Sequence, residues 1–241
     1  MIRSDSLIRF LLICAATVLA SGNPFAEWDR FEKQVRDQRF PKDTLKAGFP
    51  SVYGAFKKTQ TGTDPSAIDS PWVFPLDGYS LSSIGKDGFK PGIRYGGSAI
   101  KGYDFFDGNL HGGHPAYDIF IRDVDQDSRD DRTRKSVSVL APIDLVVLSK
   151  QDSWKPGSPQ RGGKYLWTLN PQSDLLLYFA HLDSIIANPG DTLRAGQVLG
   201  MVGRTGKNAH ARRSPTHLHF MVLRVENRIP AAFDYIRYLQ R

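Results

Sequence analysis

The sequence SPTHLHFMVL occupies residues 214–223 and carries two histidines, His217 and His219, two positions apart. Apolar residues dominate the second half of this stretch, which predicts a β-strand. Side chains alternate between the two faces of a strand, so both imidazoles are expected on the same face. Such a pair suits a metal site or a proton-transfer site, although an ordinary half-buried strand can also carry two polar residues. The other motifs of the chain have to decide between these interpretations.

The composition is that of a globular protein. The chain has 241 residues, of which 40% are hydrophobic and 24% charged, enough for one sizeable domain with extensions. The 22 glycines and 15 prolines indicate many turns and favour β-structure. A formal net charge of +7 suits an anionic partner such as a cell-wall polymer or a membrane surface. No dense basic run or aromatic-basic repeat is present, so we do not expect a nucleic acid as partner.

Residues 1–20 are predicted to be a secretory signal peptide. Arg3 and Arg9 precede an apolar run at residues 10–20, and small residues follow it. The run is shorter than the roughly 20 apolar residues of a spanning helix, although an uncleaved anchor is an alternative. We therefore expect a periplasmic or extracellular protein with no stable membrane insertion after cleavage. The sole cysteine, Cys14, lies in this segment, so the mature chain would have no disulfide and no cysteine-ligated metal.

The next segment predicts a short helix. Trp28, Phe31 and Val35 follow the i, i+3, i+7 spacing of a helix with one apolar face, within the charged residues 27–45. Pro41 is expected to end this helix.

Three parts of the chain are predicted. After the signal peptide, an N-terminal extension covers residues 21–70, and its second part, residues 46–70, is turn-rich and shows no chemical motif. The extension is expected either to pack on the main domain or to link to it, and a packed extension could be a pro-segment that limits access to a metal site. A main domain covers residues 71–241, where short apolar runs alternate with turn signals and predict an antiparallel β-sheet domain. Strands are expected at Val137–Leu140, Leu145–Leu148, Tyr165–Leu169, Leu175–Ala180 and Val198–Gly203.

An acidic segment within residues 123–134 allows two interpretations. Asp123, Asp125 and Asp127 have the spacing at which a calcium loop begins. However, Ser128 stands where that loop needs glycine, and Arg134 where it needs glutamate. We favour a solvated loop that neutralises its own charge, with a calcium site in residues 123–131 as the alternative.

A second histidine motif lies at His114 and Asp118, four positions apart. Pro115 and the glycine pair before His114 argue against a helix, so a loop is expected to deliver His114 and a strand to begin near Tyr117.

Together these residues favour a metal centre. Hydrolytic zinc typically takes three nitrogen or oxygen ligands and leaves a position for water. His114, Asp118 and one of His217 or His219 could supply such a set. The other histidine of the pair, with His181, could hydrogen-bond the bound water or a developing oxyanion. The spacing alone does not decide which of His217 and His219 binds metal.

From about Pro71 to Ile229 the chain resembles the lysostaphin-type zinc metallopeptidases, which cleave peptide bonds in bacterial peptidoglycan. Four spaced signatures carry the resemblance in the right order. They are His114-Pro115-Ala116-Tyr117-Asp118, Phe179-Ala180-His181-Leu182, the glycine-spaced segment from Gly190 to Gly206, and His217-Leu218-His219-Phe220.

The resemblance implies a mainly β, antiparallel domain of the lysostaphin type that holds one Zn²⁺ per chain. It implies His114, Asp118 and His219 as zinc ligands, and His181 and His217 as catalytic residues that assist proton transfer. The implied function is a secreted or periplasmic zinc metalloendopeptidase, whose partners are the stem peptides or cross-bridges of peptidoglycan. The alternatives are a catalytically silent wall-binding or regulatory module on the same fold, and a secreted zinc peptidase that acts on proteins.

Overall fold

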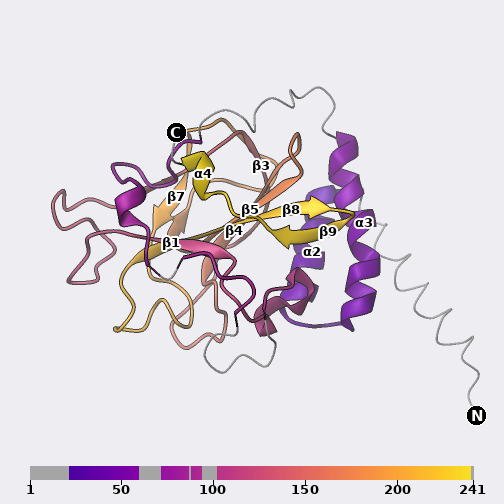
Figure 1. Cartoon of the computed structure of the whole chain (residues 1–241), viewed down its shortest axis with the longest axis horizontal. Coiled ribbons are helices and arrows are strands. Elements are labelled where there is room, and N and C mark those ends of the chain that lie inside the picture. Colours follow the sequence, from indigo (N-terminus) through magenta and orange to yellow (C-terminus); the bar gives the residue numbers. More distant parts are fainter. Residues whose placement is uncertain (1–21, 60–71, 87, 94–101, 240–241) are drawn as a thin grey trace, which may run out of the picture.

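The computed structural model describes residues 22–59, 72–86, 88–93 and 102–239 (Figure 1). The predicted signal peptide, residues 1–20, lies outside the described residues, as does the end of the predicted extension. Within the described residues, no helix combines the length and the apolar character needed to cross a lipid bilayer.

Two helices form the described part of the N-terminal extension. Helix α2 spans Pro24–Arg36, and the Asn23 side chain caps it by accepting a hydrogen bond from the Phe25 N–H at 3.0 Å. Helix α3 spans Lys42–Thr59 and contains Pro50. The predicted helix around Trp28 is thus confirmed, but it ends before Pro41.

The sequence from residue 46 is rich in turn residues, but the structure places residues 46–59 in α3. Leu45, Phe49, Val52 and Phe56 recur along one face of this helix and are almost fully buried. Their burial outweighs the low helix propensity of the glycines and Pro50, because tertiary packing supplies most of the stability of a helix in a folded protein.

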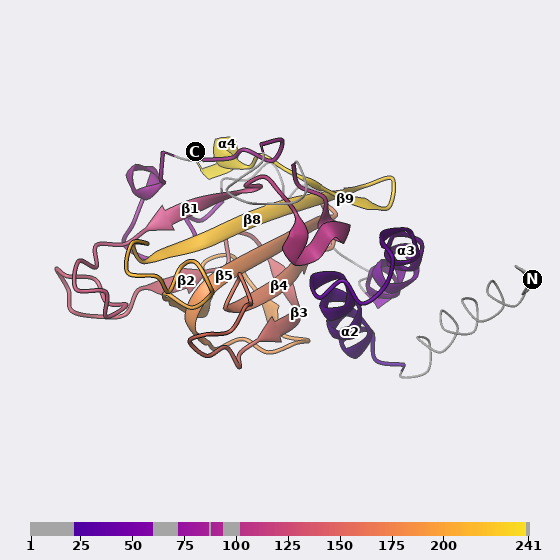
Figure 2. The same ribbon diagram turned by 90° about the horizontal axis from the view of Figure 1, so that it is seen from below.

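The strands of the described residues form one antiparallel sheet of nine strands, which confirms the predicted fold class. The central path runs β1-β8-β5-β4-β3-β6, and Figure 2 shows its strands from β1 to β3. Strand β9 pairs with the C-terminal end of β8, and β7 pairs with both β2 and β5. The strands are β1 (Ala116–Phe120), β2 (Ser138–Leu140), β3 (Leu145–Gln151), β4 (Lys164–Asn170), β5 (Leu175–Ile185), β6 (Thr192–Leu193), β7 (Val198–Val202), β8 (His217–Glu226) and β9 (Ile229–Ala232). Short helices are η3 (Leu81–Ser83), η4 (Phe105–Leu110) and α4 (Ile236–Leu239).

Each face of the sheet has its own hydrophobic core. Leu218, Phe220 and Val222 of β8 belong to the core on one face, together with residues of β2, β7 and the C-terminal segment. Met221 and Leu223 point to the other face and join a second core that includes α2, α3 and η4. The helices therefore cover the face that also carries His217 and His219, because these two residues share the alternation of Met221.

Candidate functional site

The pairing of β1 with β8 brings the first site residues together. Asp118 lies directly opposite His219 in the antiparallel register, and Phe120 lies opposite His217. His219 Nδ1 is 2.9 Å from Asp118 Oδ1, and His217 Nε2 is 3.9 Å from Asp118 Oδ2. The two histidines therefore reach the same carboxylate, as strand alternation predicts.

His114 reaches this carboxylate from the loop before β1. Its backbone exchanges two hydrogen bonds with Lys90, at 2.7 and 2.9 Å. The preceding Gly113 has φ +68, and a Cβ there would collide with the Pro91 backbone, so this close approach requires glycine. The His114 Nε2 atom is 3.3 Å from Asp118 Oδ1.

These three residues fit a divalent metal ion such as zinc. His114, Asp118 and His219 each offer a ligand atom, and the three atoms lie within 4.8 Å of one another. Ligands 2.0–2.1 Å from a tetrahedral zinc ion lie about 3.3 Å apart, close to the observed 2.9 and 3.3 Å. His114 Nδ1 lies 2.9 Å from the Gly88 carbonyl oxygen. A proton held there leaves the Nε2 lone pair facing the carboxylate, as a metal ligand requires.

His181 enters the site through a β-bulge in β5. Lys164 pairs with Leu182 and Leu166 pairs with Phe179, so both Ala180 and His181 lie opposite a single residue of β4. His181 has φ +66, in the left-handed region. Without the extra residue, alternation would turn His181 to the face of Phe179, so the bulge is what aims its side chain at the site.

The His181 and His217 rings meet edge-on, with centroids 4.9 Å apart. His181 Nδ1 is 2.8 Å from the Thr205 carbonyl oxygen, and His217 Nδ1 is 2.7 Å from that of Pro215. Each carbonyl favours a proton on Nδ1, which leaves Nε2 of both rings free to accept or donate a proton in the site.

Burial and hydrogen bonds together shift the pKa values of His181, His219 and Asp118. Desolvation lowers the pKa of His181 well below its usual value and also lowers the pKa of His219. Burial opposes ionisation of Asp118, but hydrogen bonds from His114 and His219 outweigh it and hold the pKa of Asp118 well below its usual range. Neutral imidazoles and an ionised carboxylate are the states in which these side chains bind a metal ion.

Two other histidines do not join the described metal-ligand group. His210 is exposed and packs against Trp154, with ring centroids 5.2 Å apart. His111 follows η4, and desolvation lowers its pKa to about 4.

The acidic loop supports the start of β8. The Asp123 carboxylate accepts hydrogen bonds from the backbone of Asp127 and Ser128, at 3.0 and 2.8 Å. It also accepts one from the Thr216 hydroxyl at 2.5 Å, next to His217. Asp123 thus ties the loop to the histidine strand. Carboxylates of Asp123, Asp125 and Asp131 approach one another, an arrangement common among acidic groups without an ion.

Residues 129–230 match the model of peptidase family M23. The match confirms the resemblance to lysostaphin-type peptidases. It includes His181, His217 and His219, whereas His114 and Asp118 lie before it and are joined to the site by the fold. No curated protein sequence matches the chain.

Three solved structures illustrate the similarity. A zinc-containing peptidase from Vibrio cholerae is 21% identical, with a TM-score of 0.42; the match covers 67% of this chain and 38% of that one. The catalytic domain of the antimicrobial peptidase lysostaphin from Staphylococcus simulans is 20% identical over 64% of this chain and 91% of that one, with a TM-score of 0.41. A putative glycyl-glycine endopeptidase from Ruminococcus gnavus is 21% identical over 92% of this chain and 84% of that one, with a TM-score of 0.45.

Proposed function

We propose that the protein is an exported zinc metalloendopeptidase that hydrolyses peptide bonds in bacterial peptidoglycan. The observation that carries this proposal is the convergence of His114, Asp118 and His219 beside two further histidines: the His181 ring lies 4.9 Å from the His217 ring and 5.7 Å from the His219 ring, centroid to centroid. The family match supports peptidase activity, and the net charge of +7 suits an anionic wall.

In this proposal His114, Asp118 and His219 hold one zinc ion per chain. Bound zinc supplies the Lewis-acid chemistry that polarises a scissile carbonyl and makes water nucleophilic at neutral pH. His181 and His217 are the catalytic residues. Nε2 of either ring can accept a proton from the attacking water, and the ring can then pass that proton to the leaving amine. A protonated ring also stabilises the negative charge that develops on the carbonyl oxygen.

The proposed organisation of the chain is a signal peptide at residues 1–20, a helical extension at 21–70 and a peptidase domain at 71–241. Export rests on the charged, apolar and small-residue order of residues 1–20. Because the second core joins α2 and α3 to the sheet, the extension contributes directly to the folded unit.

The test is digestion of purified peptidoglycan and of an unfolded protein, with mass spectrometry of the released fragments and metal analysis of the same preparation. We expect about one zinc per chain and new peptide ends from peptidoglycan only. His219→Ala should lose both zinc and activity, His181→Ala only activity, and the exposed His210→Ala neither. Absence of zinc, or equal activity of wild type and His181→Ala, would contradict the proposal.

A further inference from the structure

A cavity opens beside the metal-ligand group, on the side where α2 covers the sheet. It encloses about 550 Å³, its open mouth included, and is lined by Glu32, Arg36, His111, Arg161, Tyr165 and Tyr178, among others. Its position relative to the site is fixed by Tyr178, whose ring meets the His219 ring edge-on with centroids 6.3 Å apart. The cavity is therefore a neighbour of the metal-ligand group, and Tyr178 contacts both.

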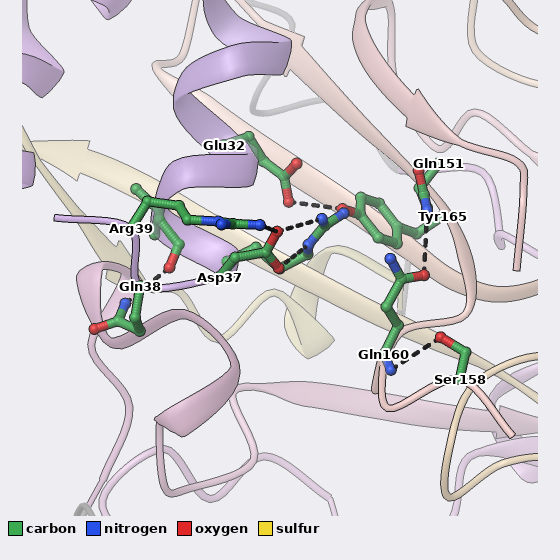
Figure 3. Close-up of polar contacts among 10 residues, drawn as sticks. Glu32, Asp37, Gln38, Arg39, Gln151, Ser158, Gln160 and Tyr165 are labelled. Carbon is green, nitrogen blue, oxygen red and sulfur yellow. Dashed lines mark hydrogen bonds and ion pairs between the residues drawn. The ribbon is translucent and has the colours of Figure 1, made fainter.

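Two of the charged residues in the cavity are already partnered. Arg36 forms an ion pair with Asp37 at 2.7 Å and donates a hydrogen bond to the Tyr165 hydroxyl at 3.0 Å. Glu32, on the same helix, accepts a hydrogen bond from Tyr165 at 2.8 Å (Figure 3). Desolvation raises the pKa of Glu32 to about 7, so near neutral pH much of this carboxyl is uncharged and repels an incoming anion little.

Arg161, unlike Arg36 and Glu32, has no charged or side-chain partner among the described residues. Its Nη1 donates to the carbonyl oxygens of Asn109 and His111, each at 3.2 Å, and these contacts fix the guanidinium at the cavity wall. Among the described residues Arg161 forms no ion pair, and its Nε and Nη2 make no hydrogen bond. Burial lowers the pKa of Arg161, because little in the protein compensates its charge. A partly buried guanidinium with an open fork is suited to a carboxylate.

Tyr178 supplies a second donor at the same place. Its hydroxyl lies against Gly162, the neighbour of Arg161, so closely that a Cβ on Gly162 would collide with it. Among the described residues this hydroxyl has no hydrogen-bond partner. Burial raises the pKa of Tyr178, so the hydroxyl keeps its proton and can donate it.

We infer that Arg161 and Tyr178 form a subsite for a carboxylate of the peptide substrate, next to the metal group on the α2 side. The open fork of Arg161 binds the two carboxylate oxygens, and the Tyr178 hydroxyl donates to one of them. Arg161 is a specificity-determining residue and takes no part in bond cleavage. The inference rests on the proposed function for the identity of the substrate, and its chemistry applies both to a chain-terminal carboxylate and to a side-chain carboxylate.

Equilibrium binding tests the subsite independently of hydrolysis. The probes are a peptidoglycan stem peptide with free carboxylates and versions in which one carboxylate at a time is a carboxamide. Binding is measured by calorimetry on the zinc-loaded His181→Ala protein, so that no probe is cleaved. One amidation should weaken binding about 10- to 100-fold, the size of a charge-assisted hydrogen-bond pair, and its position tells a terminal from a side-chain carboxylate.

The Arg161→Gln substitution, made in the His181→Ala protein, should abolish the preference for the carboxylate peptide over its carboxamide. It should weaken binding of the carboxylate peptide about 10- to 100-fold and change binding of the carboxamide little. Glutamine removes the charge and keeps much of the apolar length of the side chain. The exposed Arg194→Gln is the matched control and should bind like its parent. Equal binding of all probes by the parent, or equal weakening of carboxylate and carboxamide by Arg161→Gln, would overturn the subsite.

The two proposals fail separately. If the protein binds the carboxylate peptide selectively but the wild type cleaves no peptidoglycan, the subsite is supported and the proposed function is contradicted. If the wild type cleaves peptidoglycan but the probes bind equally well, the proposed function is supported and the subsite is contradicted.

Discussion

His181 offers a test of the backbone that aims a catalytic side chain. Its φ of +66 lies in the left-handed region, which costs a residue with a Cβ about 1–2 kcal/mol relative to glycine. The variants His181→Ala and His181→Gly both remove the imidazole and its contact with Thr205, so these losses cancel in the comparison. Glycine also gains about 0.4–1 kcal/mol of unfolded-state entropy, which works against it. The difference predicts that His181→Gly is more stable than His181→Ala by roughly 0.5–1 kcal/mol.

Urea unfolding of the metal-free proteins measures this difference, since bound zinc would add its own stabilisation. The control is Ser184 on the same strand, which is not among the residues with positive φ. There alanine should be the more stable substitution by about 0.5–1 kcal/mol, as in an ordinary strand. If alanine is also the more stable residue at 181, the bulge does not hold His181 in the left-handed conformation and the account of its orientation is wrong.

Other consequences are open to direct measurement. Asp118→Asn should release zinc in metal analysis, whereas the exposed Asp77→Asn should keep it. Gly206→Ala should lower both peptidoglycan hydrolysis and stability more than the control Gly157→Ala does. Both glycines have positive φ, but only at Gly206 would an added Cβ lie close to another residue, 2.9 Å from His181 Nδ1. Trp28→Ala should cost about 3–5 kcal/mol in urea unfolding, because its fully buried ring packs on Phe49, Phe56 and Trp167. The pKa of Glu32 rises from 4.5 to about 7 on folding, so stability should fall as pH rises through that window, by a few kcal/mol at most; Glu32→Gln should flatten this slope.

Strand alternation predicted the shared face of His217 and His219 correctly, since it depends only on local geometry. The loop position of His114 and the start of a strand near Tyr117 were also predicted, because Pro115 and the preceding glycines limit the backbone. The antiparallel architecture followed from the frequency of short apolar runs. These features depend on residues that are neighbours in the sequence, so they can be predicted without the three-dimensional structure.

The position of His181 could not be predicted in this way. Simple alternation places it on the face of Phe179, and the bulge that corrects this depends on how β4 and β5 pair. Helix α3 was missed for a related reason: Pro50 and its glycines argue locally against a helix, and only the packing of Phe49 and Phe56 on the sheet reverses that argument. Arg161 belongs to no sequence motif, and the role proposed for it rests on its place in the cavity beside His219.

The second core bears on what the N-terminal extension does. Trp28, Phe49 and Phe56 lie in one hydrophobic cluster with Trp167 and Leu176 of the sheet, and all five side chains are buried. Removing the helices would expose both sides of this cluster to water at a cost of roughly 1.5–3 kcal/mol for each large side chain. The two helices are therefore a layer of the folded unit. Through Glu32 and Arg36, α2 also forms one wall of the cavity beside the metal-ligand group, and this cavity is open to solvent with the helix in place. We therefore expect that loss of the helices would destabilise the sheet and change the shape of this cavity.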